Sequence, residues 1–405
     1  MALIMAKLFQ IQFYSPVFLC FISFFMDWFK NRKYQLLLRH LKLDNFLTMS
    51  KSEIFAELVT YDHEQVVFCN DNATGLKAII AIHNTVLGPG LGGTRVWNYA
   101  SETDALNDVL RLSRGMTYKA AISGLNLGGA KAVIIGDANQ IKTEALMRKF
   151  GRFVENLNGK YITAEDVNTT TRDMEYVHME TSHVVGLPES MGGGGDPSPV
   201  TAYGVYMGMK ASAKHAWGSD SLAGKKVAVQ GVGKVGGHLL DFLHKEGAQL
   251  VISDINEATL KQYAATHGAK VVNGDDIYSQ DVDIFAPCAL GAILNEKNIA
   301  ALKAGVIAGA ANNQLADENV HGPMLLEKGI IYAPDFLINA GGLINVYQEH
   351  IGYNRETAYR QAEHIFDVTL EILKTSVDQK IHSQKAATLL AEKRIKAIAS
   401  VQSTY

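Results

Sequence analysis

The sequence predicts an α/β protein with two domains, the second of which is built on a doubly wound parallel sheet. In the second half of the chain, short apolar runs alternate with segments in which apolar residues have helical spacing. This pattern is typical of parallel strands covered by helices. A glycine-rich turn at residues 231–236 joins one such strand to one such helix. A second glycine-rich segment, at residues 191–199, is the strongest break in the chain and predicts the domain boundary.

The first domain is expected to start with two adjacent strands at residues 66–70 and 76–83, which are short runs rich in apolar residues. The elements expected after them, in chain order, are a glycine-rich stretch at 87–95, a helix at 102–114, a strand at 132–135, a helix at 143–157 and a strand at 159–168 that runs into a polar turn. These elements make an N-terminal α/β domain.

The second domain is expected to open with a helix at residues 200–216. Its further elements are expected to be strands at 225–230, 249–253, 282–285, 306–309 and 330–332, with a helix at 238–246 and other helical segments between the strands. This alternation indicates a parallel sheet with helices on both faces.

The glycine-rich turn has the spacing of a dinucleotide-binding motif. It consists of Gly231, Val232, Gly233, Lys234, Val235 and Gly236. The glycines allow a tight turn and close approach of a pyrophosphate, and the following helix offers N–H groups and a positive dipole to phosphates. Asp254 ends the next strand, eighteen residues after Gly236, where it would hydrogen-bond a ribose diol and repel a 2′-phosphate. The motif therefore predicts a Rossmann-type domain that binds NAD rather than NADP; the alternative is a packing turn without a ligand.

Two lysines lie twelve residues apart in a segment that carries almost no other charge. Lys131 follows Gly128 and Gly129, and Lys119 precedes them. Glycines allow close backbone approach, so Lys131 could lie directly against a small ligand. A desolvated lysine has a lowered pKa and acts as a base near neutral pH. The alternative is a surface loop with two solvated lysines.

Composition excludes several classes of partner. The chain has 405 residues, 47% of them hydrophobic, and a net charge of −3, so we expect no nucleic-acid partner and no anionic membrane surface as a partner. The three cysteines form no C-x-x-C motif, which favours a reducing compartment and a cytoplasmic location. The thirteen histidines have no metal-ligand spacing, so no metal is expected.

Residues 1–48 differ in composition from the rest. The apolar run at 8–29 is interrupted by polar residues, so it is borderline for a membrane anchor and lacks the features of a signal peptide. Met49 begins a segment typical of a cytosolic start. We favour an upstream start that was assigned in error; the alternatives are a membrane-proximal anchor and a disordered or packed extension. A chain that begins at Met49 is accordingly predicted to be active.

Seven segments of the sequence form a further pattern: residues 91–95, 116–119, 124–131, 163–166, 196–204, 231–236 and 339–346. In this order they resemble the Glu/Leu/Phe/Val amino-acid dehydrogenase family, and most closely its leucine-oxidising members. With the composition break after residue 48 and the glycine-rich boundary, the chain is predicted to have four parts: an extension at 1–48, a substrate domain at 49–190, an NAD-binding Rossmann domain at 191–380 and a C-terminal helix at 381–405. The resemblance implies that this last helix returns to the substrate domain. It also implies a homo-oligomer, with octamers occurring among the leucine-oxidising members.

The resemblance further implies oxidative deamination of an L-amino acid to a 2-oxo acid and ammonia with NAD, and the reverse reductive amination. In this interpretation Lys119 holds the α-carboxylate of the substrate and Lys131 activates the attacking water. Asp166 exchanges protons with the substrate amine. Without the resemblance, Asp166 would be read as a turn-capping aspartate. The alternative for the whole chain is a non-catalytic NAD-binding regulatory protein, but such a protein has no reason to keep two buried lysines.

Four further positions are implied by the same resemblance. Gly92 and Gly93 belong to the substrate site, in the segment that ends the glycine-rich stretch. Thr201 and Asn312 are similar to residues that contact the nicotinamide side of the cofactor. Asn313 is placed as well as Asn312 for this role.

Substrate preference is predicted from four apolar positions. Glutamate-oxidising members of the family have a lysine and a serine where this chain has Leu91 and Val346. With Ala164 and Leu343, these residues would form an apolar pocket, in which the second carboxylate of glutamate would be buried unpaired at high cost. The sequence therefore predicts oxidation of leucine, isoleucine and valine. Phenylalanine stays an alternative, because residue types do not define the depth of a pocket.

Overall fold

The computed structural model describes residues 54–402. The predictions for residues 1–48 and for the start at Met49 lie outside the described residues. The chain from Glu57 onward forms one compact unit with two sheets. Within residues 54–402, no helix has the length and apolar character needed to span a bilayer.

The first sheet has five strands in the order β1-β2-β4-β3-β5. Its strands are β1 (Gln65–Asp71), β2 (Leu76–Asn84), β3 (Gly90–Trp97), β4 (Gly128–Ile135) and β5 (Tyr161–Glu165). The two strands predicted at the start of the domain are confirmed, since β1 and β2 pair antiparallel over their full length. The glycine-rich stretch provides β3, which runs parallel to both β4 and β5.

Helices cover both faces of this sheet. The helices of this part of the chain are α5 (Ile54–Tyr61), α6 (Glu102–Ile122), α7 (Ala138–Ile141), α8 (Glu144–Glu155) and α9 (Thr171–His178). Apolar residues of α6 pack on one face, and those of α8 and α9 pack on the other. Ser101 caps α6, because its side chain accepts a hydrogen bond from the Asp104 N–H. The helix was predicted to end at residue 114 but continues to Ile122, so Lys119 lies in its last turn.

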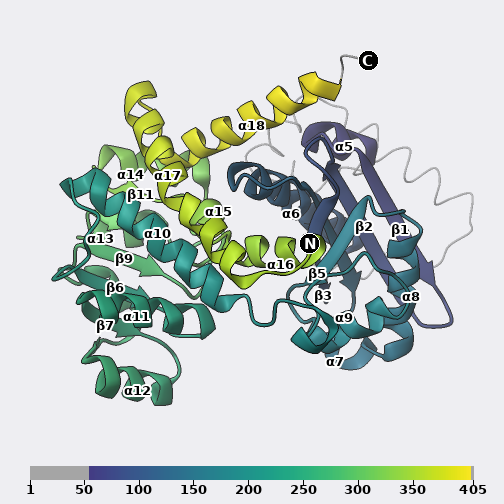
Figure 1. Cartoon of the computed structure of the whole chain (residues 1–405), viewed down its shortest axis with the longest axis horizontal. Helices are drawn as coiled ribbons and strands as arrows, with labels where there is room; N and C mark the ends of the chain where they lie inside the picture. The colour runs from purple at the N-terminus through teal and green to yellow at the C-terminus, as the bar shows by residue number, and fades with distance from the viewer. Residues whose placement is uncertain (1–53, 403–405) are drawn as a thin grey trace, which may run out of the picture. The chain divides into compact units, whose positions relative to one another are not determined.

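The second sheet has six parallel strands in the order β11-β10-β9-β6-β7-β8. Its strands are β6 (Lys226–Gln230), β7 (Gln249–Ser253), β8 (Lys270–Val271), β9 (Ile284–Pro287), β10 (Val306–Ile307) and β11 (Ile331–Tyr332). The helices are α10 (Ser198–Trp217), α11 (Lys234–Glu246), α12 (Glu257–His267), α13 (Glu296–Ala301), α14 (Glu318–Glu327), α15 (Asp335–Ile338), α16 (Gly341–Ile351), α17 (Arg355–Gln379) and α18 (Ser383–Gln402), with 3-10 turns at Glu189–Met191 and Gly274–Ser279. Figure 1 shows this sheet with α11 and α12 beside β6 and β7. The predicted α/β class with a Rossmann-type sheet is confirmed.

The last helix, α18, packs against α6 of the first half. The contact is polar as well as apolar, because the guanidinium of Arg394 donates to the carbonyls of Ala121, Gly124 and Leu125 at 3.1, 3.2 and 2.7 Å. These carbonyls lie at the C-terminal end of α6 and just beyond it, where backbone acceptors need partners. Helix α18 therefore stabilises the C-terminal end of α6, the helix that carries Lys119.

Candidate active site

Lys131 lies in the middle of β4 and is only 6% exposed. Its Nζ is 3.0 Å from Oδ2 of Asp166, so the buried ammonium has an anionic partner. Gly129, two residues before Lys131 on β4, allows the strand to lie close to α6, because a Cβ at Gly129 would lie 2.1 Å from the backbone nitrogen of Thr117. The alternative of two solvated lysines on a surface loop is therefore wrong.

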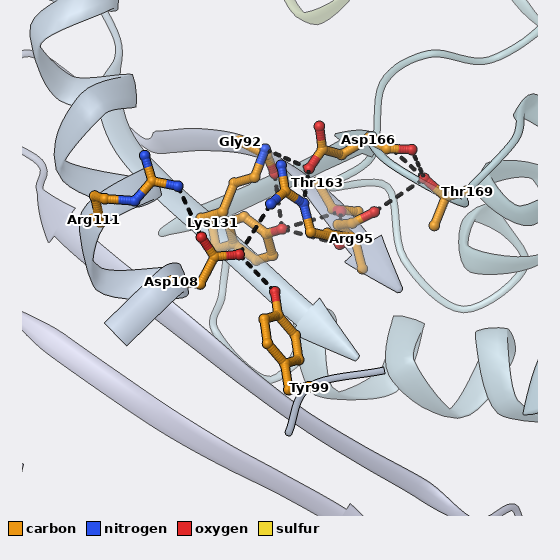
Figure 2. Close-up of polar contacts among 11 residues, drawn as sticks. Gly92, Arg95, Tyr99, Asp108, Arg111, Lys131, Thr163, Asp166 and Thr169 are labelled. Atoms are coloured by element: carbon orange, nitrogen blue, oxygen red, sulfur yellow. Dashed lines mark hydrogen bonds and ion pairs between the residues drawn. The ribbon is translucent and has the colours of Figure 1, made fainter. Parts of the chain in front are cut away.

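Asp166 follows the end of β5 and receives two charged donors on one oxygen. Oδ2 accepts from Lys131 and, at 3.1 Å, from Nε of Arg95 on β3. The backbone N–H of Asp166 donates to Oγ1 of Thr169 at 2.8 Å, and this bond shapes the turn that carries the carboxylate. Figure 2 shows the carboxylate within reach of both the lysine and the arginine.

A second carboxylate holds Arg95 from the other side. Nη1 of Arg95 is 3.0 Å from Oδ2 of Asp108 on α6. The same oxygen accepts from the hydroxyl of Tyr99 at 2.7 Å, and Oδ1 of Asp108 lies 2.9 Å from Arg111. Together with Lys131 and Asp166, these side chains form a row of alternating charge (Figure 2). Arg95, Asp108 and Tyr99 were not predicted as site residues from the sequence, in which the only signal was the position of Arg95 at the end of the 91–95 segment.

Burial and charge shift the pKa values of this group in opposite directions. Burial tends to raise the pKa of Asp166, but the positive charges of Lys131 and Arg95 outweigh it, so the pKa is lowered. Burial lowers the pKa of Lys131, and the nearby Asp166 only partly opposes that effect. Burial also lowers the pKa of Lys119, to about 8. Asp166 is therefore an ionised carboxylate, and the Lys131 amine beside it is easier than usual to deprotonate.

Lys119 contacts the second half of the chain. Its Nζ donates to Oδ1 of Asn339 at 2.7 Å, and Nδ2 of Asn339 donates to Oδ1 of Asn312 at 2.7 Å. Asn339 ends α15, whose first residue, Asp335, is buried and accepts from the Gln314 N–H at 2.8 Å. Asn339 and Asp335 were not predicted as site residues from the sequence, although Asn339 begins the 339–346 segment.

The glycine-rich turn lies between β6 and α11. A Cβ at Gly236 would lie 2.0 Å from the carbonyl oxygen of Gly231, whose φ of +95° favours glycine. Gly233 is the N-cap of α11 and offers no side-chain cap, and a Cβ there would meet nothing within 4 Å. No side chain caps the first N–H groups of α11, and the space beside Gly233 is open, which suits an anionic ligand.

Asp254 lies beside this turn. Its Oδ2 accepts from the Val232 N–H at 2.6 Å and its Oδ1 from the Asn256 N–H at 2.8 Å. Lys234 is exposed, with its Nζ 3.3 Å from Oδ2 of Asp196, and Val235 packs against the apolar core. The carboxylate predicted to face a ribose is thus held at the C-terminal edge of the sheet, next to the glycines.

Thr201 and Asn312 come from separate elements. Thr201, in the first turn of α10, donates to the carbonyl of Pro197 at 2.9 Å. A Cβ at Gly342 would lie 3.0 Å from its Oγ1, so it borders the start of α16. Asn312 is exposed apart from its bond to Asn339, while Asn313 has a left-handed φ of 52°. The contact to Asn339 distinguishes Asn312 from Asn313, which the sequence could not do.

The four apolar positions belong to one connected apolar cluster. Leu91, Ala164 and Leu343 are buried, at 2%, 7% and 6% exposure, and the half-buried Val346 packs against the cluster one turn after Leu343 on α16. Gly92 and Gly93 follow Leu91 on β3, and Gly93 pairs with Ala164 on β5. The apolar side chains thus come from β3 and β5 of the first sheet and from helix α16.

A cavity of about 690 Å³ lies between α6 and the second half of the chain, and neither Lys119 nor Asn339 lines it. Its lining includes Asn312, Asp335 and Arg111, from the second half and from α6. This volume is in the range of small-molecule sites. Among residues 54–402, no group of three or more His, Cys, Asp and Glu side chains is arranged to hold a metal ion.

Comparison with known proteins identifies the family. The profile "Glu/Leu/Phe/Val dehydrogenase, dimerisation domain" matches residues 63–183, and "Glutamate/Leucine/Phenylalanine/Valine dehydrogenase" matches residues 192–258 and 249–403. The chain belongs to the Glu/Leu/Phe/Val dehydrogenase family. It is therefore an amino-acid dehydrogenase, and the predicted family is confirmed.

Members with different names are similar to this dehydrogenase. Leucine dehydrogenase of Bacillus cereus is 55% identical over 353 residues, which cover 87% of this chain and 96% of that protein. Phenylalanine dehydrogenase of Caldalkalibacillus thermarum is 46% identical over 356 residues, 86% of this chain and 96% of that protein. The crystal structure of L-tryptophan dehydrogenase from Nostoc punctiforme superposes with a TM-score of 0.78 at 48% identity and covers 85% of this chain and 99% of that chain.

Proposed function

We propose that this dehydrogenase oxidises L-leucine, L-isoleucine and L-valine with NAD, and catalyses the reverse reductive amination. The observation that carries the chemistry is the buried pair of Lys131 and Asp166, 3.0 Å apart, with Lys119 in the neighbouring helix. The substrate class is supported by the apolar cluster around Leu91 and Leu343. The 55% identity to a protein named leucine dehydrogenase supports the same class.

In this proposal the side chains act in sequence on one amino acid. The ammonium of Lys119 binds the α-carboxylate and fixes the orientation of Cα. Asp166, ionised because of its two cationic neighbours, accepts a proton from the substrate ammonium. NAD, when bound, would supply the hydride acceptor for Cα. Lys131, whose pKa is lowered by burial, would in its neutral form take a proton from the water that attacks the iminium carbon. Asp166 would then return its proton to the nitrogen of the resulting carbinolamine, and ammonia would leave as the carbinolamine hydroxyl loses its proton to solvent and becomes the carbonyl of the 2-oxo acid.

The residues around the glycine turn fit a dinucleotide. The uncapped N-terminus of α11 at Gly233 would bind the pyrophosphate, and the tight turn at Gly231 and Gly236 keeps the backbone within reach of it. Asp254 would bind the ribose diol and disfavour a 2′-phosphate, so we infer a preference for NAD. Thr201 and Asn312 would lie on the nicotinamide side.

The apolar pocket is proposed to exclude glutamate. Burying a second carboxylate beside Leu91, Ala164, Leu343 and Val346 would leave a charge without a partner. Each buried methylene is worth about 0.8 kcal/mol, so preference among leucine, isoleucine and valine should be modest. The relatives named for phenylalanine and tryptophan make an aromatic substrate the second candidate.

NADH formation with a panel of amino acids tests this proposal. We expect kcat/KM to be highest for L-leucine, L-isoleucine or L-valine, lower for L-phenylalanine and L-tryptophan, and negligible for L-glutamate. Glutamate as the best substrate would refute the apolar-pocket argument, and an aromatic amino acid as the best would assign the enzyme to another branch. No NADH with any of the six would favour the non-catalytic NAD-binding alternative.

The assembly is proposed to be a homo-oligomer, with the first sheet as the substrate part and the second as the NAD-binding part. The dimerisation-domain profile matched by residues 63–183 supports self-association. Light scattering after gel filtration would measure the mass against the 44.2 kDa of one chain. A monomeric mass at micromolar concentration would contradict this part of the proposal.

A further inference from the structure

We propose that Arg95 and Asp108 are positioning residues for Asp166: Arg95 holds the Asp166 carboxylate beside Lys131, and Asp108 holds Arg95. Neither residue has a role in the reaction proposed above. This inference deepens that reaction and rests on it, because Asp166 is taken to exchange protons with the substrate amine.

The two oxygens of Asp166 have different roles in this arrangement. Both ion pairs, with Lys131 at 3.0 Å and Arg95 at 3.1 Å, use Oδ2. Oδ1 takes part in neither of these pairs. Two donors on one oxygen fix the rotation of the carboxylate, and they leave Oδ1 as the atom that can exchange a proton with a substrate.

The chemistry of a guanidinium suits it to hold a carboxylate in a fixed orientation. Arginine keeps its proton at all pH values relevant to proteins, and its donors have a fixed planar arrangement. Arg95 can therefore orient Asp166 without competing for the proton that Asp166 exchanges. Lys131, whose pKa is lowered by burial, could not provide that fixed anchor alone, because in the proposed reaction it changes its own protonation state.

The guanidinium of Arg95 is itself bound on two sides, by Asp166 at Nε and by Asp108 at Nη1. Asp108 binds Nη1 of Arg95 at 3.0 Å while Tyr99 and Arg111 bind Asp108 at 2.7 and 2.9 Å. The side chains of Arg95, Asp108 and Asp166 are only 21, 17 and 22% exposed, so the charges interact more strongly than an exposed pair would. This support from α6 goes beyond what a single surface ion pair provides.

A purely structural role is the competing explanation, because the same bonds connect β3 to α6. The two explanations differ in their effect on pH dependence. Without the positive charge of Arg95, protonated Asp166 and protonated Lys131 would both become more favourable, so the pKa of each would rise. The active form would then appear only at higher pH, whereas a lost structural tie would lower stability without moving the pH profile.

The test compares Arg95→Met, Asp108→Asn and the double variant with the parent enzyme and L-leucine. For Arg95→Met we expect kcat/KM to fall about 30-fold and the acid limb of its pH profile to move up by about one unit. Asp108→Asn should lower kcat/KM by less and should move the limb less, because loss of the negative charge of Asp108 itself lowers the pKa of Lys131 and opposes the effect of loosening Arg95. In the double variant the Asp108 change should add little, because Asp108 acts through Arg95.

Arg148→Gln is the matched control. Arg148 forms a guanidinium–carboxylate pair with Glu180 at 2.6 Å in the same half of the chain, but it does not contact Asp166. Its removal should leave the pH profile unchanged. If Arg95→Met or, should that variant fail to fold, Asp108→Asn keeps kcat/KM within about twofold and the limb in place, the inference is wrong.

A readout without turnover separates this inference from the proposed function. The carboxyl ¹³C resonance of Asp166, assigned with Asp166→Asn, gives the pKa of Asp166 directly. A parent that makes no NADH would overturn the proposed function, while an upward shift of the pKa of Asp166 in Arg95→Met would still support the positioning role. An unshifted pKa in Arg95→Met would overturn that role even in an active enzyme.

Discussion

The nucleotide half of the site consists mainly of backbone groups, whereas the substrate half consists of charged side chains. The nucleotide half uses the backbone of one continuous turn, residues 231–236, with a single carboxylate, Asp254, held beside it by the Val232 N–H. The substrate half uses charged side chains that arrive from separate elements: Lys131 from β4, Arg95 from β3 and Asp166 from the end of β5.

This difference has a physical consequence. Backbone N–H groups at a helix N-terminus carry partial charge at no desolvation cost beyond that of the fold itself. Buried ammonium and carboxylate groups each need a partner, and removing one leaves the other uncompensated. Substitutions in the nucleotide half should therefore act mainly on cofactor binding, and those in the substrate half mainly on chemistry and pH dependence.

The largest effect is expected for Lys131→Ala. Turnover should fall by at least about 100-fold, the scale of a positioned acid–base group, while the dissociation constant for NAD stays nearly unchanged. Asp166 keeps Arg95 as a partner at 3.1 Å, so the variant should fold. Steady-state kinetics and NAD titration by fluorescence measure the two effects.

Lys142→Ala is a matched control for that experiment. Lys142 also pairs with an aspartate, Asp173, at 2.6 Å in the same half of the chain, and should not change turnover of the folded enzyme. Near-parental turnover in purified Lys131→Ala, or an equal loss in the control, would remove the basis for treating Lys131 as the base.

In the nucleotide half, Gly233→Ala should separate binding from stability. The added Cβ meets nothing within 4 Å and the φ of −75° is accessible to alanine, so the variant should fold. Alanine is a poorer N-cap than glycine, so the free energy of unfolding should fall slightly, by about 0.5 kcal/mol. NAD binding should weaken about tenfold, because the methyl group would occupy the space in which the pyrophosphate approaches the backbone. Thermal unfolding and NAD titration test both signs.

Gly305→Ala controls for the glycine substitution itself. A Cβ at Gly305 also meets nothing within 4 Å, and the residue is exposed before β10. It should leave the affinity for NAD unchanged. Equal affinities in Gly233→Ala and Gly305→Ala would show that the cofactor does not approach Gly233.

A somewhat smaller effect is expected for Asp254→Asn, which concerns cofactor selectivity. The amide oxygen can still accept from the Val232 N–H, although the bond from the Asn256 N–H is lost, and the negative charge that disfavours a 2′-phosphate is removed. We expect the ratio of kcat/KM for NADP to that for NAD to rise several-fold. An unchanged ratio would mean that Asp254 serves the turn and not the ribose.

The same contrast explains what the sequence could predict. The nucleotide half is encoded locally: strand, glycine spacing, helix and acid follow one another, and each was predicted at its place in the chain. The apolar core was predictable for the same reason, since β1, β2, β6 and β7 are short apolar runs. Helix α6 was predicted too short, because nothing in the sequence before Gly115 indicates whether a helix passes through a glycine.

The charged network could not be predicted in this way. Arg95 and Asp166 are seventy-one positions apart, and Lys119 is 220 from Asn339, so only the paired strands and the packed helices bring them together. Burial is also a property of the fold: Lys131 has an unusual pKa because β4 is covered, which no local pattern states. The resemblance to a family identified the lysines and Asp166, but it did not identify their supports, Arg95 and Asp108.

The smallest expected effect is a pH dependence of carboxylate binding that arises from Lys119. Burial lowers its pKa to about 8, so the ammonium loses its charge as pH rises through that value, and affinity for a substrate carboxylate should decline in the alkaline range. The 2-oxo acid of leucine is the suitable ligand, because it has the carboxylate but no amine that titrates. Its inhibition constant should rise several-fold between about pH 7 and pH 9. Lys119→Arg should lose this dependence, since a guanidinium stays charged throughout, and Lys119→Gln should bind weakly at every pH. A parent whose inhibition constant is flat over this range, or an arginine variant with the same slope as the parent, would show that another group binds the carboxylate.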